Sequence, residues 1–437
     1  MGKVVKLQPK TPEEAKVAAR RRPIAPRGVG RPGAIDRRRR PRRHKTALVL
    51  GGGGFTGGVY EIGALRALDL LAVNSSVNGF DVYVGTSAGS FIAALCANGV
   101  TPEEMMRVLM RHGEAPFRAA ELGDLLRPNL LELARKSALL PLRAASIARQ
   151  VVLQRGTVTL MDIMLELAEG LPAGLYTGGG IETYLHRVLR GPDRSDDFRD
   201  LACELYLTAT DLDTCERVVF GTAGMEDVPI STAVRASGAL PMVYTPVRVG
   251  ERELIDGGLL STTNLDIAVE AGAKLVVVIN PIVPFVTDRS EPLGDGSVIE
   301  PKRVSQMGFP HIGYQAFKLV AHQRLHEQAA RWAETYPGVD IVLIEPEQSD
   351  ELMFETSMMN FASRVAIARH GFESVTRHLV DEYERFSNIA ERHEIEISAE
   401  RLSEVVAGLD HDEDASGWRR LLTGTAGALL RQSGLAS

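Results

Sequence analysis

The apolar positions of this chain fall into short runs that alternate with helical patterns. Thr46–Leu50 is an apolar run typical of a buried strand, and a helical pattern follows from Val59 to about Leu71. Strands that alternate with helices favour a parallel sheet with helices on both faces. The sequence therefore predicts a three-layer α/β/α fold with a mostly parallel central sheet. Further strand patterns lie at residues 80–84, 204–210, 275–279 and 339–344.

Two stretches depart from this alternation. Residues 103–160 carry helical patterns and predict a helical insertion, and the chain from about residue 354 is also predicted to be helical. Four segments are expected: a basic disordered arm, a core with the insertion, an α/β and helical extension packing on the core, and an acidic linker with a short terminal helix. Their bounds are 1–45, 46–285 with the insertion at about 103–160, 286–408 and 409–437.

The charge is distributed unevenly. Residues 1–45 carry 16 Lys and Arg against three acidic residues, within a chain of formal net charge −6. Such an arm contacts anionic lipid headgroups or stays a solvated tail, and we expect no nucleic-acid partner. Residues 133–161 contain no acidic residue and form a basic amphipathic stretch. Peripheral contact with an anionic membrane is one interpretation of that stretch, and a helical cap on the core is the favoured one.

The composition restricts the class of protein and its compartment but does not indicate a function. The chain has 44% hydrophobic and 24% charged residues, as ordinary globular proteins do. Its three cysteines form no Cys-x-x-Cys pair, which fits a reducing compartment. No apolar run is long enough to predict a membrane span, so a cytoplasmic location is expected, with peripheral membrane contact as its extension. Nothing in the pattern fixes the oligomeric state.

The pentapeptide Gly85-Thr86-Ser87-Ala88-Gly89 is the strongest candidate for chemistry. It lies between a predicted strand and a predicted helix, which is the context of a nucleophile elbow. In such an elbow, Gly85 and Gly89 leave room for a sharp turn that exposes the Oγ of Ser87 near a helix N-terminus. The helix dipole there favours developing negative charge.

The glycine-rich loop at residues 51–58 allows two interpretations. A dinucleotide site needs an acidic residue about 20 residues further on to hold the ribose, and Asp81 is too distant. An oxyanion hole needs only backbone amides that no side chain obstructs, and a serine elbow on the next strand makes that interpretation specific. We favour the oxyanion hole. The loop residues expected at this site are Gly52, Gly53, Gly54 and Gly57.

A nucleophilic serine needs a base. No histidine after Ser87 follows a strand in a glycine-rich turn, where the base of a Ser-His-Asp triad is expected. Asp256, followed by Gly257 and Gly258, is the alternative, because a buried carboxylate with a raised pKa accepts a serine proton. Two rivals stay open: a Ser-His-Asp esterase of the α/β-hydrolase type, and a non-catalytic lipid-binding module.

His322 and His326 lie four residues apart on a predicted helix and are followed by Glu327. This spacing places two potential metal ligands on one helix face. The sequence shows no third ligand, so we expect solvent-facing histidines and no metal.

These motifs together resemble the patatin-like phospholipase family. The glycine loop, Gly85–Gly89 and Asp256–Gly258 occur in the family's order and spacing. Val234–Pro241 is similar to the segment that precedes the Asp-Gly-Gly motif there, and Ala209–Leu212 to another recurring stretch. Asn264 stands where the family tends to place an asparagine. The resemblance covers about residues 46–285 and extends more loosely to about 380.

The resemblance implies a Ser87–Asp256 dyad in a three-layer fold, acting on a lipid or ester substrate as an acyl hydrolase or phospholipase A. It implies no metal or organic cofactor. The amides near Gly52–Gly54 would hold the oxyanion. One departure is Thr56, which stands where the family usually has Lys or Arg before the last glycine of the loop. This departure bears on which amides form the hole.

Overall fold

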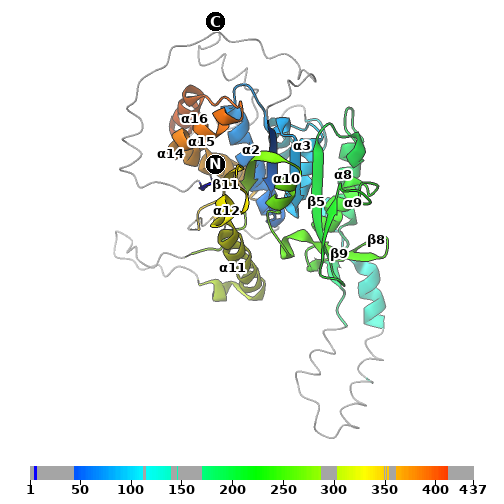
Figure 1. Cartoon of the computed structure of the whole chain (residues 1–437). Helices are drawn as coiled ribbons and strands as arrows, with labels where there is room; N and C mark the ends of the chain where they lie inside the picture. Colours follow the sequence, from blue (N-terminus) through cyan, green and yellow to red (C-terminus); the bar gives the residue numbers. More distant parts are fainter. Residues whose placement is uncertain are drawn as a thin grey trace, which may run out of the picture.

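The computed structural model describes residues 4–6, 44–111, 115–138, 145, 170–286, 303–348, 350, 352–353 and 361–411. Within these ranges one mixed sheet runs through the centre of the molecule, in the order β1-β11-β10-β2-β3-β5-β9-β8 with β6 beside β5 (Figure 1). Its strands are β1 (Val4–Lys6), β2 (Lys45–Leu50), β3 (Val82–Thr86), β5 (Glu204–Asp211), β6 (Arg217–Phe220), β8 (Val247–Val249), β9 (Arg252–Asp256), β10 (Ala273–Ile279) and β11 (Asp340–Ile344).

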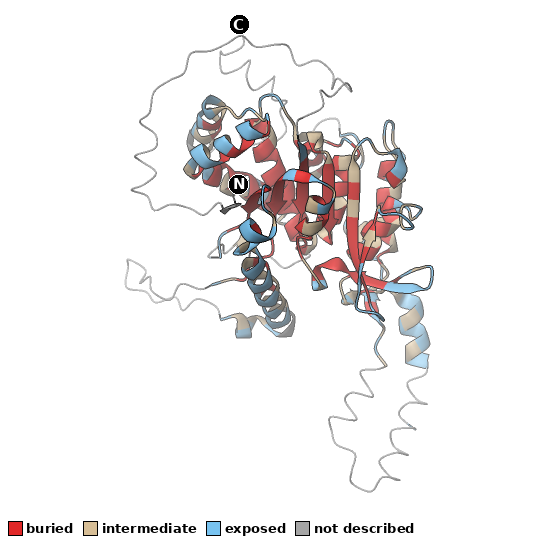
Figure 2. Cartoon of the chain, viewed as in Figure 1, coloured by how far each residue is buried: buried red, intermediate tan, exposed pale blue. Residues whose placement is uncertain are grey.

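The sheet is parallel from β1 to β5 and antiparallel where β6, β8 and β9 join it. Alternate residues of β2 point to opposite faces, and both sets are buried. Leu48 and Leu50 belong to one hydrophobic cluster, whereas Ala47 and Val49 belong to another. Burial on both faces is typical of parallel sheets and explains the continuous apolar runs in the sequence (Figure 2).

Helices cover both faces and make the three layers. The larger cluster receives α2 (Gly54–Leu71), α3 (Ala88–Ala97), α4 (Pro102–Met110), α8 (Gly179–Leu189), α9 (Ile230–Ser237), α14 (Arg364–Asp381), α15 (Tyr383–Arg392) and α16 (Ala399–His411). The other face is covered by α10 (Leu265–Glu270), α11 (Phe309–Ala329) and α12 (Trp332–Thr335). The predicted fold class, including the helical C-terminal part, is confirmed. A pair of short strands, β4 (Gly174–Tyr176) and β7 (Met242–Tyr244), lies apart from the main sheet.

At three places the described elements cross the bounds of the expected segments. Val4–Lys6 is not part of a disordered arm, because its backbone adds a parallel edge strand to β11. The segment expected at 286–408, an α/β and helical extension packing on the core, contributes β11 to the central sheet, where it pairs with β10. The predicted linker at 409 starts too early, because α16 continues to His411. The remaining parts of 1–43 and residues 412–437 lie outside the described residues.

The first helix also begins earlier than its apolar pattern predicts. α2 starts at Gly54 rather than near Val59, so three of the loop's glycines belong to the helix. The apolar periodicity missed this first turn because glycines carry no side chain. Their absence of a Cβ allows close packing: a Cβ on Gly57 would lie 3.0 Å from Cγ of Pro281, and one on Gly58 would lie 3.4 Å from Cβ of Ala88.

The predicted insertion is helical in part: residues 115–121 and 126–129 are not helical, and Pro128 forms a β-bridge with Tyr176. α4 begins with a capping box of Thr101 and Glu104. A short helix α5 (Leu122–Leu125) and a helical stretch at 130–138 follow, the latter largely exposed (Figure 2). Leu131 in that stretch is 86% exposed. Most of the basic stretch 133–161 lies outside the described residues, so its membrane contact stays a prediction. Among the described helices, none combines the length and hydrophobicity needed to span a bilayer.

Candidate active site

Ser87 occupies the sharp turn between β3 and α3. It is the N-cap residue of α3 and has φ 54° and ψ −124°, a strained combination for a residue other than glycine. Two serines hold it there. The Ser87 N–H donates to Oγ of Ser237 at 2.8 Å, and Oγ of Ser90 donates to the Ser87 carbonyl at 2.5 Å. Strain that the surroundings support in this way is typical of functional sites.

The glycines on either side of Ser87 are required by close contacts. A Cβ on Gly85 would lie 2.6 Å from Cα of Ser90, and a Cβ on Gly89 would lie 2.4 Å from the carbonyl oxygens of Leu50 and Gly51. The Gly89 N–H also donates to the Gly51 carbonyl at 3.1 Å. The elbow is therefore packed directly against the glycine loop.

Sheet register brings Asp256 to Ser87. Thr86 lies opposite Thr208 on β5, and Asp256 at the end of β9 lies opposite Ala209, one residue further along. The Ser87 hydroxyl donates to Oδ2 of Asp256 at 2.5 Å. The two residues, 169 positions apart in the sequence, are thus joined directly, and both are buried.

The second carboxylate oxygen of Asp256 is also fixed. The Gly258 N–H donates to Oδ1 at 2.8 Å, which leaves Oδ2 for the serine. Gly257 permits this turn, because a Cβ there would lie 2.4 Å from the Thr208 carbonyl oxygen. Gly258 therefore positions the carboxylate through its amide, and Gly257 allows the turn to pack closely against β5.

Burial changes the acidity of this carboxyl group. Desolvation raises the pKa of Asp256 to about 6, although the hydrogen bonds from Ser87 and Gly258 oppose the rise. A base with such a pKa is largely ionised at neutral pH and is stronger than an ordinary aspartate. The native protein therefore holds this proton more tightly than the unfolded chain does, and ionisation lowers stability as the pH rises from about 4 to about 6.

A polar network under the dyad joins three elements. The Asn264 side-chain amide donates to Oγ1 of Thr86 at 2.9 Å and to Oγ1 of Thr208 at 3.1 Å, and the two threonine hydroxyls are 3.0 Å apart. All three residues are buried, so their polar groups need these partners. Family resemblance pointed to Asn264, but its threonine partners became visible only through the strand register.

The glycine loop runs beside the serine. A Cβ on Gly52 would lie 3.3 Å from Cβ of Ser87, so any side chain there would crowd the nucleophile. Gly53 has φ 152°, and a Cβ on it would lie 2.8 Å from Cα of Gly57. The Gly57 N–H donates within the first turn of α2, to the Gly53 carbonyl at 3.0 Å. Gly57 therefore serves close packing, and its amide is not directed to the serine.

Two cavities meet at Ser87. The smaller, about 40 Å³, contains the dyad and the residues of the glycine loop, and is closed by Tyr314 and Phe317 of α11. Sequence reasoning missed both aromatic residues, because α11 is distant along the chain and carries no motif. No histidine is among the described residues that line either cavity. His370, one of the alternatives for a triad, instead forms a hydrogen bond with Asp350.

The larger cavity, about 180 Å³, extends from Ser87 between α2, α3 and α4. Its lining is apolar except for a few groups, and Arg364 is the one charged side chain among the described lining residues. Apolar residues that shape it include Val59, Ile62, Phe91, Ile92, Leu95, Met105, Val108, Leu109, Phe117, Ile181 and Val234.

The fold and this site define a class: an α/β protein with a serine on a nucleophile elbow, hydrogen-bonded to a buried aspartate. A model of the patatin-like phospholipase family matches residues 48–269, which is half of the chain. The chain belongs to this family, as the sequence motifs predicted.

Three known proteins to which the chain is similar follow. The chain is 24% identical over 231 residues to the protein named "Probable lipid hydrolase 463L" of Invertebrate iridescent virus 6, a match that covers 53% of this chain and 65% of the relative. The chain thus spans just under two thirds of that protein's length. Among solved structures, VipD from Legionella pneumophila matches with a TM-score of 0.35 and 16% identity, covering 77% of this chain and 66% of VipD. ExoU of the Pseudomonas aeruginosa type III secretion system, in complex with SpcU, matches with a TM-score of 0.25 and 17% identity, over 90% of this chain and 77% of the other.

The pKa of Asp256 predicts the pH dependence of any reaction in which it acts as base. For a small uncharged ester, kcat/KM should fall about tenfold for each pH unit below about 6 and level off above it, because only the carboxylate accepts the serine proton. Initial rates across pH measure this, with Asp213→Asn at an exposed aspartate as control. A rate that persists undiminished to about pH 4.5, near the ordinary carboxyl pKa, contradicts the raised value.

Proposed function

We propose that this protein is a lipid acyl hydrolase in which Ser87 is the nucleophile and Asp256 the base. The observation that carries the proposal is the 2.5 Å hydrogen bond from Oγ of Ser87 to the buried Oδ2 of Asp256. This bond places a base within reach of the serine, and burial raises the pKa of that base to about 6, which suits neutral pH. Membership of the patatin-like phospholipase family and the lipid-hydrolase name of the viral relative support the same reaction.

The reaction proceeds through an acyl-enzyme. Oγ of Ser87 attacks the ester carbonyl carbon while Oδ2 of Asp256 takes the hydroxyl proton. Collapse of the tetrahedral intermediate breaks the bond to the leaving alcohol, which receives that proton from Asp256. Water then attacks the acyl-serine, with Asp256 again as base, and releases the carboxylic acid and the free serine.

Backbone amides at the start of α2 are suited to hold the oxyanion. The Gly52 N–H donates to the Thr262 carbonyl at 3.3 Å, and Gly57 donates within its helix, so the amides of Gly53 and Gly54 are the better candidates. They lie at the N-terminus of an 18-residue helix, whose dipole favours negative charge. Removing one such donor typically costs about 10²–10³ in rate.

The apolar cavity indicates the substrate class. A hydrocarbon chain fits a channel whose walls are almost wholly aliphatic and aromatic, whereas a polar acyl group would lose its hydration there without replacement. An acyl chain in the cavity places its carbonyl at Ser87, where the two cavities meet. Long-chain esters, as in lipids, are therefore the proposed substrates.

Replacement of the dyad separates this function from its rivals. Ser87→Ala and Asp256→Asn should each lower ester turnover by at least about 10³-fold, because each removes a partner of one chemical step. Ser403→Ala and Asp213→Asn, at exposed positions, are matched controls. His311→Ala and His370→Ala should keep rates within about threefold of the parent. Loss of turnover in either histidine variant supports a triad, and wild-type protein that is folded but inactive supports a binding module.

The cavity predicts a chain-length preference that one residue controls. Leu95 lines the larger cavity and lies eight residues beyond Ser87, about 12 Å along α3. Leu95→Phe should lower kcat/KM for dodecanoyl and longer esters by at least about tenfold. It should leave butanoyl esters within about twofold, because the Ser87 end is unchanged.

The control for this prediction is Leu95→Met, which conserves volume and should preserve the preference. Hydrolysis of a homologous series of p-nitrophenyl esters measures both variants. An equal loss of kcat/KM for short and long esters would show that the acyl chain does not bind in the cavity beside Leu95.

A further inference from the structure

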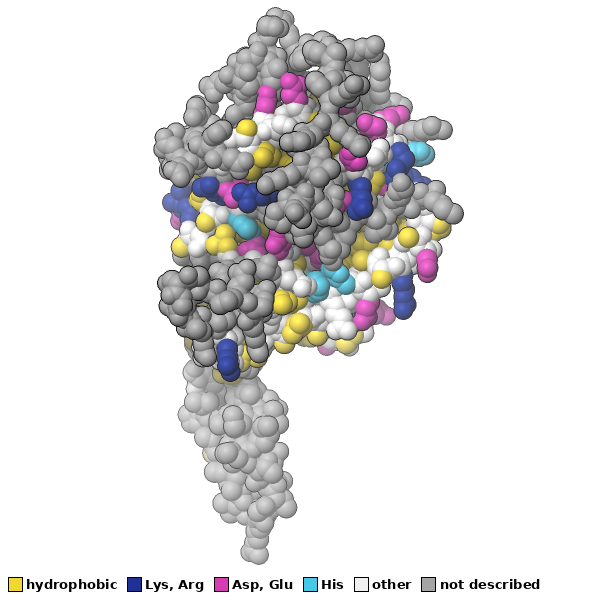
Figure 3. Space-filling view, turned by 90° about the vertical axis from the view of Figure 1, so that its left-hand side faces the viewer, with side chains coloured by type: hydrophobic (Ala, Val, Ile, Leu, Met, Phe, Trp, Pro, Cys, Tyr) yellow, Lys and Arg dark blue, Asp and Glu magenta, His cyan; other side chains and the backbone are white. Residues whose placement is uncertain are grey.

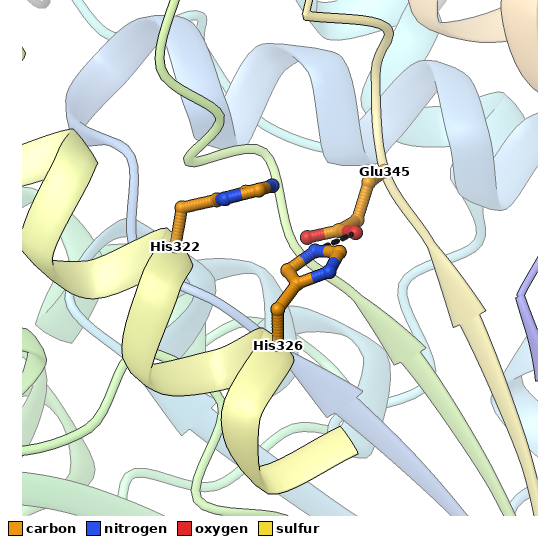
Figure 4. A group of neighbouring side chains, drawn as sticks. All are labelled: His322, His326 and Glu345. Carbon is orange, nitrogen blue, oxygen red and sulfur yellow. Dashed lines mark hydrogen bonds and ion pairs between the residues drawn. The ribbon is translucent and has the colours of Figure 1, made fainter. Parts of the chain in front are cut away.

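A second group of chemically active side chains lies at the same edge of the sheet, outside the catalytic cavities. His322 and His326 stand one turn apart on α11, and Glu345 directly follows β11 (Figure 4). The ligand atoms of these three residues all lie within 4.8 Å of one another. The sequence showed only the two histidines, because Glu345 lies 19 residues beyond His326 and meets it through the fold.

The contacts within this group converge on one point. Nε2 of His326 is 2.9 Å from Oε2 of Glu345, and the two imidazole rings stack with their centroids 3.9 Å apart. Figure 4 shows both rings extending from α11 toward the carboxylate. Glu345 is buried, whereas both histidines are half-buried. The side chain of His326 is 25% exposed, so an ion in solution has access to it. Histidine side chains reach the surface on the face of the molecule that Figure 3 shows.

The donor set selects the kind of ion. Two imidazole nitrogens and one carboxylate oxygen suit Zn²⁺ and similar divalent transition metals, whereas Mg²⁺ and Ca²⁺ prefer oxygen ligands alone. Ligands of a tetrahedral zinc ion lie about 3.4 Å from one another, given metal–ligand distances of about 2.0–2.1 Å. With the ligand atoms within 4.8 Å of one another, binding requires side-chain adjustments of about an ångström.

A neighbouring residue holds the carboxylate in a suitable orientation. The side-chain amide of Asn280, which follows β10, donates to Oε1 of Glu345 at 2.8 Å. That bond directs Oε2 toward the histidines. Metal-binding carboxylates and imidazoles commonly have such outer partners, which fix their orientation. Nε2 of Gln348 lies 3.1 Å from Nε2 of His322.

We propose that His322, His326 and Glu345 bind one divalent transition-metal ion of the zinc type, with a water molecule in the fourth position. This site shares no residue with the Ser87–Asp256 dyad, and the bound ion takes no part in the proposed reaction. The ion replaces the hydrogen bond between His326 and Glu345 with two bonds to a common centre.

The position of the site gives the ion a structural role. The same helix that carries the histidines supplies Tyr314 and Phe317 to the cavity of the dyad. Glu345 follows β11, and Asn280 follows β10. The next strand in the sheet after β10 is β2, which leads into the glycine loop. A metal ion here fastens α11 to the carboxyl edge of the sheet and so fixes that wall of the cavity.

Titration of the full-length, chelator-treated protein with Zn²⁺ and with Co²⁺ tests the proposal. We expect one ion per chain by calorimetry, visible absorption bands typical of tetrahedral Co²⁺, and a rise in Tm on adding Zn²⁺. Glu345→Gln and His326→Ala should each weaken binding at least about 100-fold, and Asn280→Ala about tenfold. His311→Ala, on the same helix outside the group, is the matched control.

Circular dichroism establishes that each variant is folded before its affinity is compared. Zn²⁺ affinity in Glu345→Gln equal to that of the parent, or no saturable binding to the parent, overturns the proposal and leaves a hydrogen-bonded His–Glu pair. Because Zn²⁺ binding is read independently of turnover, an inactive protein that binds the ion would count against the proposed hydrolase alone.

Discussion

The geometry of the site is organised around one short hydrogen bond between two buried groups, the hydroxyl of Ser87 and the carboxylate of Asp256. Burying a carboxylate is costly, and the fold offsets that cost with a serine hydroxyl on one oxygen and the Gly258 amide on the other. The same burial that destabilises the charge raises the pKa of Asp256 to about 6 and makes it a better base. The strain at Ser87 has the same origin, because only a sharp turn brings its Oγ to that carboxylate.

Much of this arrangement could be predicted because its signals are local. The buried strands are visible in the sequence as apolar runs. The nucleophile elbow needs small residues at fixed positions around Ser87, because larger side chains would collide with neighbouring backbone. Asp256 was found from its glycines, which serve the same purpose against β5. Its contact with Ser87 was an expectation from family resemblance, and no short-range pattern predicts a contact across 169 residues.

Contacts that depend on the register between distant segments could not be predicted from the sequence. Thr86 and Thr208 look like ordinary strand residues, yet their hydroxyls meet Asn264 beneath the dyad. The start of α2 was missed because glycines have no hydrophobic signal. Glu345 completes the histidine group only because β11 lies next to β10 and faces α11. Reactive side chains therefore lie together at the carboxyl edge of the sheet, where the loops that follow the parallel strands meet.

The central claim is that Ser87 is an activated nucleophile. Intact-protein mass spectrometry after exposure to a long-chain alkyl fluorophosphonate, followed by peptide mapping, measures this directly. We expect one adduct per chain, located on Ser87, and labelling at least about 10²-fold slower in Asp256→Asn because the base is lost. An adduct on another residue, or equal labelling rates in the parent and Asp256→Asn, contradicts it.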